Sequence, residues 1–325
     1  MRVAVLHQHV PPNAGEDEQD VLEEAATVSE ALRELGHTVY ESTFTLDLPK
    51  VTADLRALQP EVVFNLVESV EGSGRLLSLA PLLLDFLKIP YTGCPAEAAF
   101  CTGNKLIGKQ ILKAAGIPTP PWLTPSTLAA EASQAESWIV KSVWEHASIG
   151  LTENSVVSGE SGLAEGLRRA EASAAGESFA EAFIHGREFN ISVLGGPDGP
   201  EVLPVAELVF VDFPEGRPKI VDYRAKWHED SFEYEHTVRS FLFPPEDAVL
   251  LQQLRDLSLK CWALFRLRGY ARVDYRVDDQ GNPWVLEVNT NPCISKQAGF
   301  MNAARQAELT PATVVNRIIA DSVTQ

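Results

Sequence analysis

The chain has 325 residues, of which 45% are hydrophobic and 22% charged, as in an ordinary globular protein of two or three domains. Its formal charge of −18 leaves no basic excess to neutralise nucleic-acid phosphates or lipid headgroups, so neither nucleic acid nor a membrane is an expected partner. The first residues turn polar too early for a signal-peptide core, no apolar run reaches membrane-spanning length, and the 4 cysteines form no CxxC pair, which together predict a cytoplasmic protein with free thiols.

The first hundred residues alternate between strand and helix patterns. An apolar run over 2–6 predicts a strand, and apolar residues then recur at helical spacing from Val21 to Leu35, where Gly36 ends the helix. Further strands are expected at 38–40 and 62–64, and a helix at 76–87. This alternation predicts a parallel α/β domain, which we place at residues 1–98.

The middle of the chain has a different pattern. A helix is expected from Lys105 to Ala115, closed by Gly116. Strands at 138–141 and 155–157 flank a loop at 142–150, and a helix at 161–174 precedes a strand at 179–183. These elements predict a small α+β domain over residues 99–186.

The remaining residues, 187–325, form the third predicted domain. A long helix at about 246–267 precedes strands at 270–277 and 284–289, and the turn at 278–282 joins these strands into a hairpin.

This hairpin carries the most informative group of polar residues. Successive side chains on a strand alternate faces, so Arg272 and Asp274 share a face, as do Glu287 and Asn289, and strand pairing brings the four together. Two carboxylates and an amide oxygen suit Mg²⁺, and a neighbouring arginine suits a phosphoryl group or an oxyanion. The alternative is a solvated salt-bridge ladder, which is disfavoured because Asn289 begins an irregular turn at a strand end.

Upstream residues suit a nucleotide. Lys105 at the head of a helix and Lys141 at the end of an apolar strand can donate to phosphates, although single lysines are usually solvated. Glu181 with Phe183 and Ile184 can border an adenine, and Glu188 can accept from ribose hydroxyls. Without this context the segment 181–188 is an ordinary strand–turn–strand. GxxxxGK[ST], GxGxxG, HExxH and GxSxG motifs are absent from the sequence.

In their order and spacing these segments resemble the ATP-grasp superfamily and, within it, D-alanine–D-alanine ligase and its relatives, over nearly the whole chain. The resemblance is carried by PYTG at 90–93, NK at 104–105, WIVK at 138–141, GREF at 186–189, DYRAKW at 222–227, RVD at 272–274 and EVNTNP at 287–292. It implies a three-domain ATP-grasp fold of class α/β, with ATP held between the central and C-terminal α+β domains.

The resemblance also implies residue roles. The predicted ATP contacts are Lys105, Lys141, Glu181, Phe183, Ile184, Glu188 and Lys226, and the predicted magnesium ligands are Asp274, Glu287 and Asn289. Two magnesium ions are expected, with Mn²⁺ as a substitute. We count Arg272, which steadies the acyl phosphate, among the catalytic candidates together with Lys226 and Ser148.

Departures from the family pattern concern the amino-acid substrates. Ala147 and Trp227 stand where D-alanine ligases carry a serine and usually a tyrosine, while Cys293 replaces a glycine and Ala298 replaces the serine that grips the second D-alanine. The glycine-rich segment with the substrate-binding glutamate is replaced by residues 11–20. The predicted substrate-binding residues are therefore Asp17, Glu18, Trp227, Arg272, Asn291, Cys293 and Ala298.

We therefore expect an ATP-dependent carboxylate–amine ligase that forms an amide through an acyl phosphate. Its expected substrates are a small-molecule carboxylate and an amine, amino-acid or peptide-like, other than D-alanine. The alternatives are a genuine D-alanine–D-alanine ligase and an ATP-binding regulator without turnover. Homodimers are common in the resembling family, so analogy alone suggests a homodimer.

Overall fold

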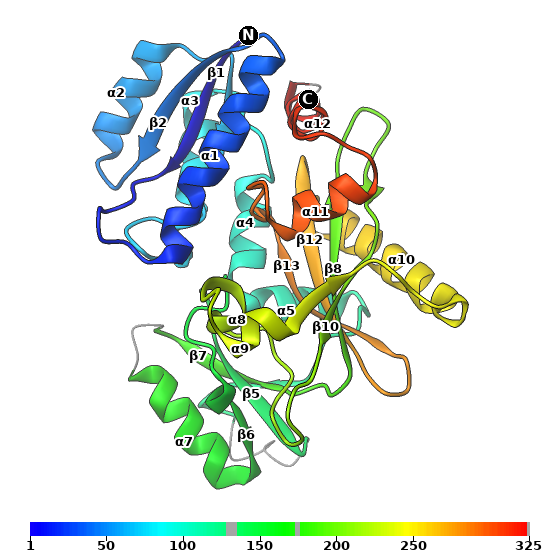
Figure 1. Ribbon diagram of the computed structural model, residues 1–325. Coiled ribbons are helices and arrows are strands. Elements are labelled where there is room, and N and C mark those ends of the chain that lie inside the picture. The colour runs from blue at the N-terminus through cyan, green and yellow to red at the C-terminus, as the bar shows by residue number, and fades with distance from the viewer. Residues whose placement is uncertain (128–134, 173–175, 324–325) are drawn as a thin grey trace.

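The computed structural model describes residues 1–127, 135–172 and 176–323, which form three sheets with helices packed around them (Figure 1). In the N-terminal unit, β1 (Arg2–Gln8) lies between β2 (Thr38–Phe44) and β3 (Val62–Asn65), and both neighbours are parallel to it. Helices α1 (Glu16–Glu34), α2 (Leu48–Leu58) and α3 (Leu79–Leu87) complete this unit. The parallel α/β arrangement predicted for this part of the chain is confirmed.

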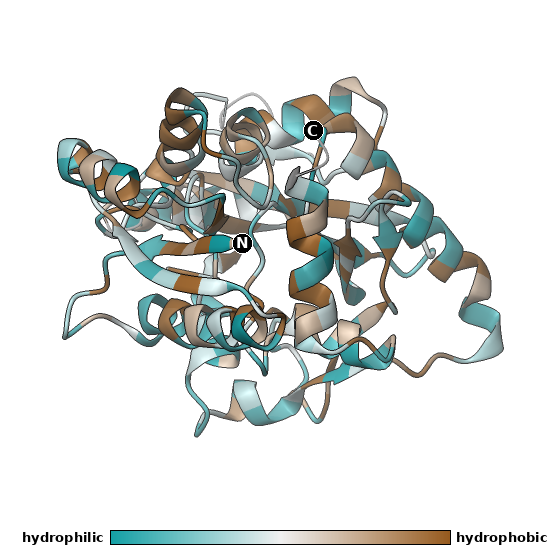
Figure 2. Cartoon of the chain, turned by 90° about the horizontal axis from the view of Figure 1, so that it is seen from above, coloured by the Kyte–Doolittle hydropathy of each residue, from teal (hydrophilic) through white to brown (hydrophobic). Residues whose placement is uncertain are grey.

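Amphipathic sequence explains the helices of this unit. Val21, Ala25, Val28 and Leu32 of α1 are buried against β1, which is itself almost fully buried. Figure 2 shows such helices with hydrophobic and hydrophilic residues on different sides. Gly36 adopts a φ of 80° just beyond α1, the left-handed conformation in which glycine ends helices. The predicted helix 76–87 is interrupted: a 3₁₀ turn at Gly74–Leu76 precedes α3.

The middle unit is an antiparallel sheet of order β4-β7-β5-β6, and a helix packs on it. Its strands are β4 (Trp122–Leu123), β5 (Ser137–Ser142), β6 (Val156–Ser158) and β7 (Ser178–Ala182), and α7 (Gly159–Glu171) packs on them through Leu163 and Leu167. The predicted strands at 138–141 and 155–157 correspond to β5 and β6, which pair antiparallel, and a 3₁₀ turn at Glu153–Ser155 leads into β6. The end of the helix predicted at 161–174 falls on residues 173 and 174, outside the described part.

The third unit is a sheet of order β11-β10-β8-β12-β13, with β9 paired to β8. Its strands are β8 (Arg187–Leu194), β9 (Glu201–Val202), β10 (Ala206–Phe210), β11 (Thr237–Ser240), β12 (Tyr270–Val277) and β13 (Pro283–Asn289). The long helix predicted at 246–267 is shorter in the structure, because a 3₁₀ turn at Pro245–Asp247 precedes α10 (Ala248–Leu264).

Helices connect the three units. α4 (Ala96–Gly103) and α5 (Lys105–Ala114) contact β13, and Ala98 and Leu112 join the buried cluster under the third sheet. α11 (Gly299–Gln306) and α12 (Pro311–Val323) both contact β8 of the third sheet, and their buried side chains join the cluster that contains α1 and β1. Two short helices, α8 (Tyr223–Trp227) and α9 (Phe232–His236), lie near the centre of the molecule, above the middle unit in the view of Figure 1.

The domain boundaries at 98 and 186 stay predictions, although α5 packs on the third sheet rather than on the middle one. None of the helices in the described ranges is both long and apolar enough to cross a membrane.

Candidate active site

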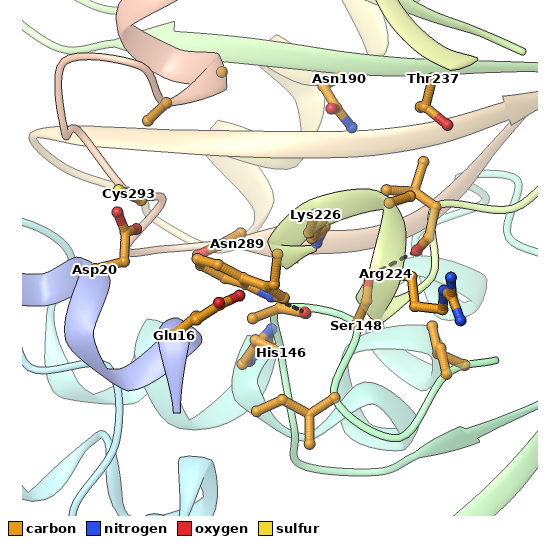
Figure 3. A pocket seen from close by; sticks show the side chains of 18 of the residues that line it. Glu16, Asp20, His146, Ser148, Asn190, Arg224, Lys226, Thr237, Asn289 and Cys293 are labelled. Atoms are coloured by element: carbon orange, nitrogen blue, oxygen red, sulfur yellow. Dashed lines mark hydrogen bonds between the residues drawn. The ribbon is translucent and has the colours of Figure 1, made fainter. Parts of the chain in front are cut away.

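A cavity of roughly 1340 Å³ opens where the three units meet. It is larger than the ~300–1,000 Å³ of a typical small-molecule site, so it has room for a nucleotide beside other substrates. One wall is a face of the third sheet, the first half of α1 lines another side, and α8 and the loop after β5 also line the space (Figure 3).

The β12–β13 hairpin places the predicted polar group on the cavity side of the sheet. Arg272 pairs in register with Asn289, and Asp274 pairs with Glu287, so all four side chains line the cavity. The Arg272 guanidinium donates from Nε and Nη2 to the two Asp274 carboxylate oxygens at 2.7 and 2.8 Å. Asn190, opposite Asp274 on β8, donates to the same carboxylate at 2.8 Å. The predicted juxtaposition is confirmed.

Glu287 lies among positive charges. Its Oε2 is 3.4 Å from Lys105 Nζ and 3.7 Å from His146 Nδ1. Burial opposes ionisation of Glu287, but Lys105, His146 and Lys226 outweigh it and hold its pKa well below the usual range. Burial, and after it the charge of Lys105, lowers the pKa of His146. Burial and then Arg272 likewise lower the pKa of Lys226.

Lys105 and Lys141, which line the cavity, and the buried Lys109 are all held by acceptors. Lys105 Nζ donates to the carbonyl oxygen of Glu145 at 2.5 Å. Lys141 and Lys109 each donate to a different oxygen of Glu181 at 2.6 Å, and Glu181 and Lys109 are almost completely buried. Burial works against the Glu181 charge, yet the two lysines lower its pKa. Glu181 therefore fixes Lys141 at the cavity wall, while it does not itself line the cavity.

Glu188 lines the cavity from β8 and forms an ion pair with Arg276 at 2.9 Å. Burial raises its pKa despite this partner. Phe183 lies just outside the cavity lining, with the Arg276 guanidinium 5.3 Å from its ring centre. Ile184, next along the chain, is partly buried and also lies outside the lining.

Three side-chain hydrogen bonds hold α8, and Val221 just before it, over the cavity. Tyr223 Oη donates to Asp17 on α1 at 2.7 Å, Trp227 Nε1 donates to the Ala147 carbonyl at 3.1 Å, and Ser148 Oγ donates to the Val221 carbonyl at 2.7 Å. Ala147 and Ser148 both have positive φ, 56° and 62°, a conformation that costs non-glycine residues about 1–2 kcal/mol each. Such strain is typical of functional loops, and here it turns this loop toward α8.

The wall formed by α1 is acidic. Glu16, Asp20, Glu23 and Glu68 line the cavity there, next to Cys293. Burial, and after it the charge of Asp20, raises the pKa of Glu68 to about 8. Asp17 and Glu18 do not line the cavity, since Asp17 is bonded to Tyr223. The sequence did not single out Glu68 or Asp20, and only the acidic run at 16–20 hinted at this wall.

The predicted residues beyond β13 separate into two groups. Cys293 and Ala298 line the cavity, while Asn291 lies outside the lining, accepts a 2.7 Å hydrogen bond from Tyr270 and donates to the Val67 carbonyl at 3.3 Å. Asn289 Oδ1 accepts from the Asn291 backbone N–H at 2.9 Å, which shapes the turn. The predicted residues gathered in the cavity are Lys105, Lys141, Ser148, Glu188, Lys226, Trp227, Arg272, Asp274, Glu287, Asn289, Cys293 and Ala298.

The donor set around Asp274 and Glu287 fits hard divalent cations. Within the described residues, groups of three or more His, Cys, Asp or Glu that could hold a metal ion are absent. A site of two carboxylates and one amide oxygen suits Mg²⁺, which keeps several waters and takes further oxygens from substrate phosphates. Lys105 and Arg272, which neutralise the carboxylates in the structure, can turn to those phosphates instead.

Comparisons with known proteins agree with this geometry. A family model described as "D-ala D-ala ligase C-terminus" matches residues 111–320. A D-alanine–D-alanine ligase of Synechococcus sp. (strain JA-2-3B'a(2-13)) is 31% identical over 299 residues, covering 90% of this chain and 85% of the relative. That of Pseudomonas entomophila (strain L48) is 33% identical over 328 residues, covering 99% and 93%.

Among solved structures, the D-alanine–D-alanine ligase of Bacillus anthracis complexed with ATP superposes with a TM-score of 0.76 at 22% identity, covering 99% of this chain and 97% of the other. This likeness confirms the predicted fold class.

Proposed function

The chain belongs to the D-alanine–D-alanine ligase family of ATP-grasp enzymes, and from this premise we propose that it couples a carboxylate to an amine other than D-alanine. As in the rest of the family, the reaction is carbon–nitrogen ligation with release of ADP. The observation that carries the proposal is the cluster of Arg272, Asp274 and Glu287 beside Lys105 in one large cavity.

The nucleotide half of the site supports the first part of this proposal. Lys105, Lys141 and Lys226 bring three ammonium groups to the cavity, where they are suited to the phosphates of ATP. Glu188 is the proposed acceptor for the ribose hydroxyls, and Glu181, Phe183 and Ile184 are proposed to border the adenine.

Asp274, Glu287 and Asn289 are the proposed ligands of two magnesium ions. When bound, the ions offset the charge that gathers on the transferring phosphoryl group. Asp274 and Glu287 meet across the strand pair, so both carboxylates are held on the same side by backbone pairing rather than by flexible loops.

The chain's own groups then support two displacements. A carboxylate oxygen of the first substrate attacks the γ-phosphorus and ADP leaves, while Lys226 and Arg272 hold the phosphoryl oxygens. The amine next adds to the carbonyl of the acyl phosphate and phosphate leaves, with Arg272 beside the tetrahedral centre. α8 and the Ser148 loop shield the anhydride from water, which would otherwise hydrolyse it.

The other half of the cavity favours substrates different from D-alanine. Ala298 offers no hydroxyl to a carboxylate, and Ala147 and Trp227 offer a carbonyl–indole bond in place of the family's serine and tyrosine. Losing a hydroxyl that bonds a carboxylate costs about 1.5–3 kcal/mol, or roughly ten- to a hundredfold in binding. Asp17 and Glu18 stay predicted substrate contacts, and Glu16, Asp20 and Glu68 are further candidates on the same wall.

Release of ADP and phosphate from Mg-ATP, measured with D-alanine alone and with a panel of amino acids and dipeptides, tests this proposal. We expect the fastest release with a pair other than two D-alanines. Release with D-alanine alone at the rate of the best pair would assign the chain to D-Ala-D-Ala synthesis. Tight ATP binding with no release for any pair would indicate a regulator without turnover. Cytoplasmic location and a homodimer stay predictions.

A further inference from the structure

Arg239 lies on β11, the strand at one edge of the third sheet, and its side chain lines the cavity. It pairs with Leu208 on β10, which in turn pairs with Glu188 on β8. Directly opposed residues in neighbouring strands point to the same side of a sheet. Arg239 therefore faces the same space as Glu188, although the family motifs in the sequence do not include it.

The Arg239 guanidinium has no partner among the residues that the structure describes. Its Nε is buried without a hydrogen bond, and no carboxylate of the described chain forms an ion pair with it. Arg272 and Arg224, the other arginines in the described cavity lining, are paired with Asp274 and Glu233. Arg239 is thus the cavity arginine with an uncompensated charge.

A second polar group beside Arg239 is also unsatisfied. Thr237 lies two residues earlier on β11, so it shares the face of Arg239, and its hydroxyl oxygen is buried without a hydrogen-bond partner. Figure 3 shows the side chains of Thr237 and Asn190 pointing from the sheet into the cavity. Buried polar groups without hydrogen bonds and unpaired charges destabilise a folded protein. The Arg239 guanidinium and the Thr237 hydroxyl, on one face of the strand, therefore point to a ligand that binds both.

The position of Arg239 relates it to the amine substrate. Its Nη2 lies 3.0 Å from the point where a Cβ on Gly299 would be, so the guanidinium packs on the start of α11. Ala298, which stands where the resembling ligases carry a carboxylate-gripping serine, is the N-cap of that helix and provides no capping side chain. Burial, and after it the charge of Arg272, lowers the pKa of Arg239. The two guanidinium groups are therefore close enough to repel each other.

We propose that Arg239 and Thr237 bind the carboxylate of the amine acceptor and that Arg239 is the specificity-determining residue for it. The acceptor is then an amino acid or peptide with a free carboxylate. A bidentate ion pair with Arg239 binds this carboxylate, in place of the serine hydroxyl that Ala298 lacks. A guanidinium offers two parallel N–H donors that match a carboxylate, and a threonine hydroxyl adds a third donor. This inference rests on the proposed function, because it names the class of one substrate.

The test compares acids with their amides. ADP release is measured for the wild type, Arg239→Gln and Arg239→Lys with each acceptor acid and with its amide. The acids are glycine, D-alanine, L-alanine and Gly-Gly, and the amides are glycinamide, the two alaninamides and glycylglycinamide. The wild type should prefer the acid, and Arg239→Gln should raise KM for the acid about ten- to a hundredfold while KM for the amide and for ATP change little. Arg239→Lys should retain part of the preference. Arg255→Gln, an exposed arginine on α10, is the matched control.

Equal use of acids and amides by the wild type would overturn the inference, as would an unchanged preference in Arg239→Gln. A rise in KM for ATP alone would assign Arg239 to the nucleotide phosphates and would also overturn it. If no pair of substrates releases ADP, the proposed function fails, and a binding measurement then tests the carboxylate site separately. In thermal unfolding with Mg-ADP, the acids should then still raise the unfolding temperature of the wild type more than the amides do, and Arg239→Gln should abolish this difference. If the wild type shows no such difference, the carboxylate site is rejected.

Discussion

Asp274 and Glu287 are direct partners across the β12–β13 pair, yet each carboxylate is neutralised from a different side. Arg272, on the same strand, holds Asp274, whereas Lys105, from the head of α5, approaches Glu287. The strand pairing thus fixes two carboxylates side by side, and the positively charged side chains around them come from separate elements. If metal ions bind the two carboxylates, the side chains of Arg272 and Lys105 become available to contact substrate phosphates. This exchange of partners requires no movement of the backbone.

Glu287→Gln tests this arrangement. The amide keeps the size of the side chain but removes the charge that balances Lys105 and Lys226 and that we propose attracts a divalent ion. We expect ADP release to fall by on the order of a hundredfold or more, with the fold retained. Steady-state rates with the best substrate pair, and circular dichroism for the fold, provide the measurement. Glu34→Gln, at the exposed end of α1, serves as the control, and near-normal turnover in Glu287→Gln would refute the metal assignment.

Tyr223→Phe tests the closure over the cavity. The change deletes only the hydroxyl that donates to Asp17, which joins α8 to α1. A hydrogen bond of this kind contributes about 1 kcal/mol, so the open state should gain roughly fivefold in population. We expect more ATP to be hydrolysed per amide formed, because water reaches the acyl phosphate.

The ratio of ADP to amide product measures this uncoupling. Tyr40→Phe, on β2 and away from the cavity, is the matched control. An unchanged ratio in Tyr223→Phe would mean that the Asp17 bond does not govern access of water.

The sequence predicted the parts of the site that depend on local pattern. Strand alternation and a short turn were sufficient to place Arg272, Asp274, Glu287 and Asn289 on one face, and the register confirms it. Lys105 was predicted correctly at the start of a helix, because Asn104 caps that helix by accepting from the Ile107 N–H at 2.9 Å.

Other features depend on contacts between residues far apart in the chain. Glu68 and Asp20 become one acidic wall only when β3 and α1 pack on β1, and no local pattern encodes that neighbourhood. The short strand β11 follows a long connection from β10 that contains α8 and α9, and it lacks a strong alternating pattern, so the cavity-facing position of Arg239 was missed. The ion pairs of Glu181 likewise unite α5, β5 and β7.

Glu68 gives the protein a specific pH dependence. Its pKa is raised from 4.5 to about 8, chiefly by burial and then by Asp20. The folded chain therefore binds more protons at this group than the unfolded chain between these two values, so its contribution to stability is present at acid pH and is lost as the pH rises toward 8. Glu68→Gln removes the charge, and it should raise the unfolding temperature more at about pH 8.5 than at about pH 5.

Thermal unfolding at both pH values checks this sign. Glu97→Gln, in the exposed first turn of α4, is the control and should leave the pH dependence of the wild type in place. A larger stabilisation at about pH 5 than at about pH 8.5 in Glu68→Gln would contradict the raised pKa.

Gly186 is required by the backbone that leads into β8 and thereby positions Glu188. Its φ is +130°, and a Cβ there would lie 2.0 Å from the Val277 carbonyl oxygen, which is backbone and has little freedom to move. Gly186→Ala should therefore cost about 3 kcal/mol or more in the free energy of unfolding. Gly281, in the β12–β13 turn, also has a positive φ of +80° but nothing within 4 Å of its Cβ position, so Gly281→Ala should cost only about 1 kcal/mol. Urea unfolding of both variants separates the clash from the dihedral penalty, and equal losses would show that the close approach to Val277 is absent in solution.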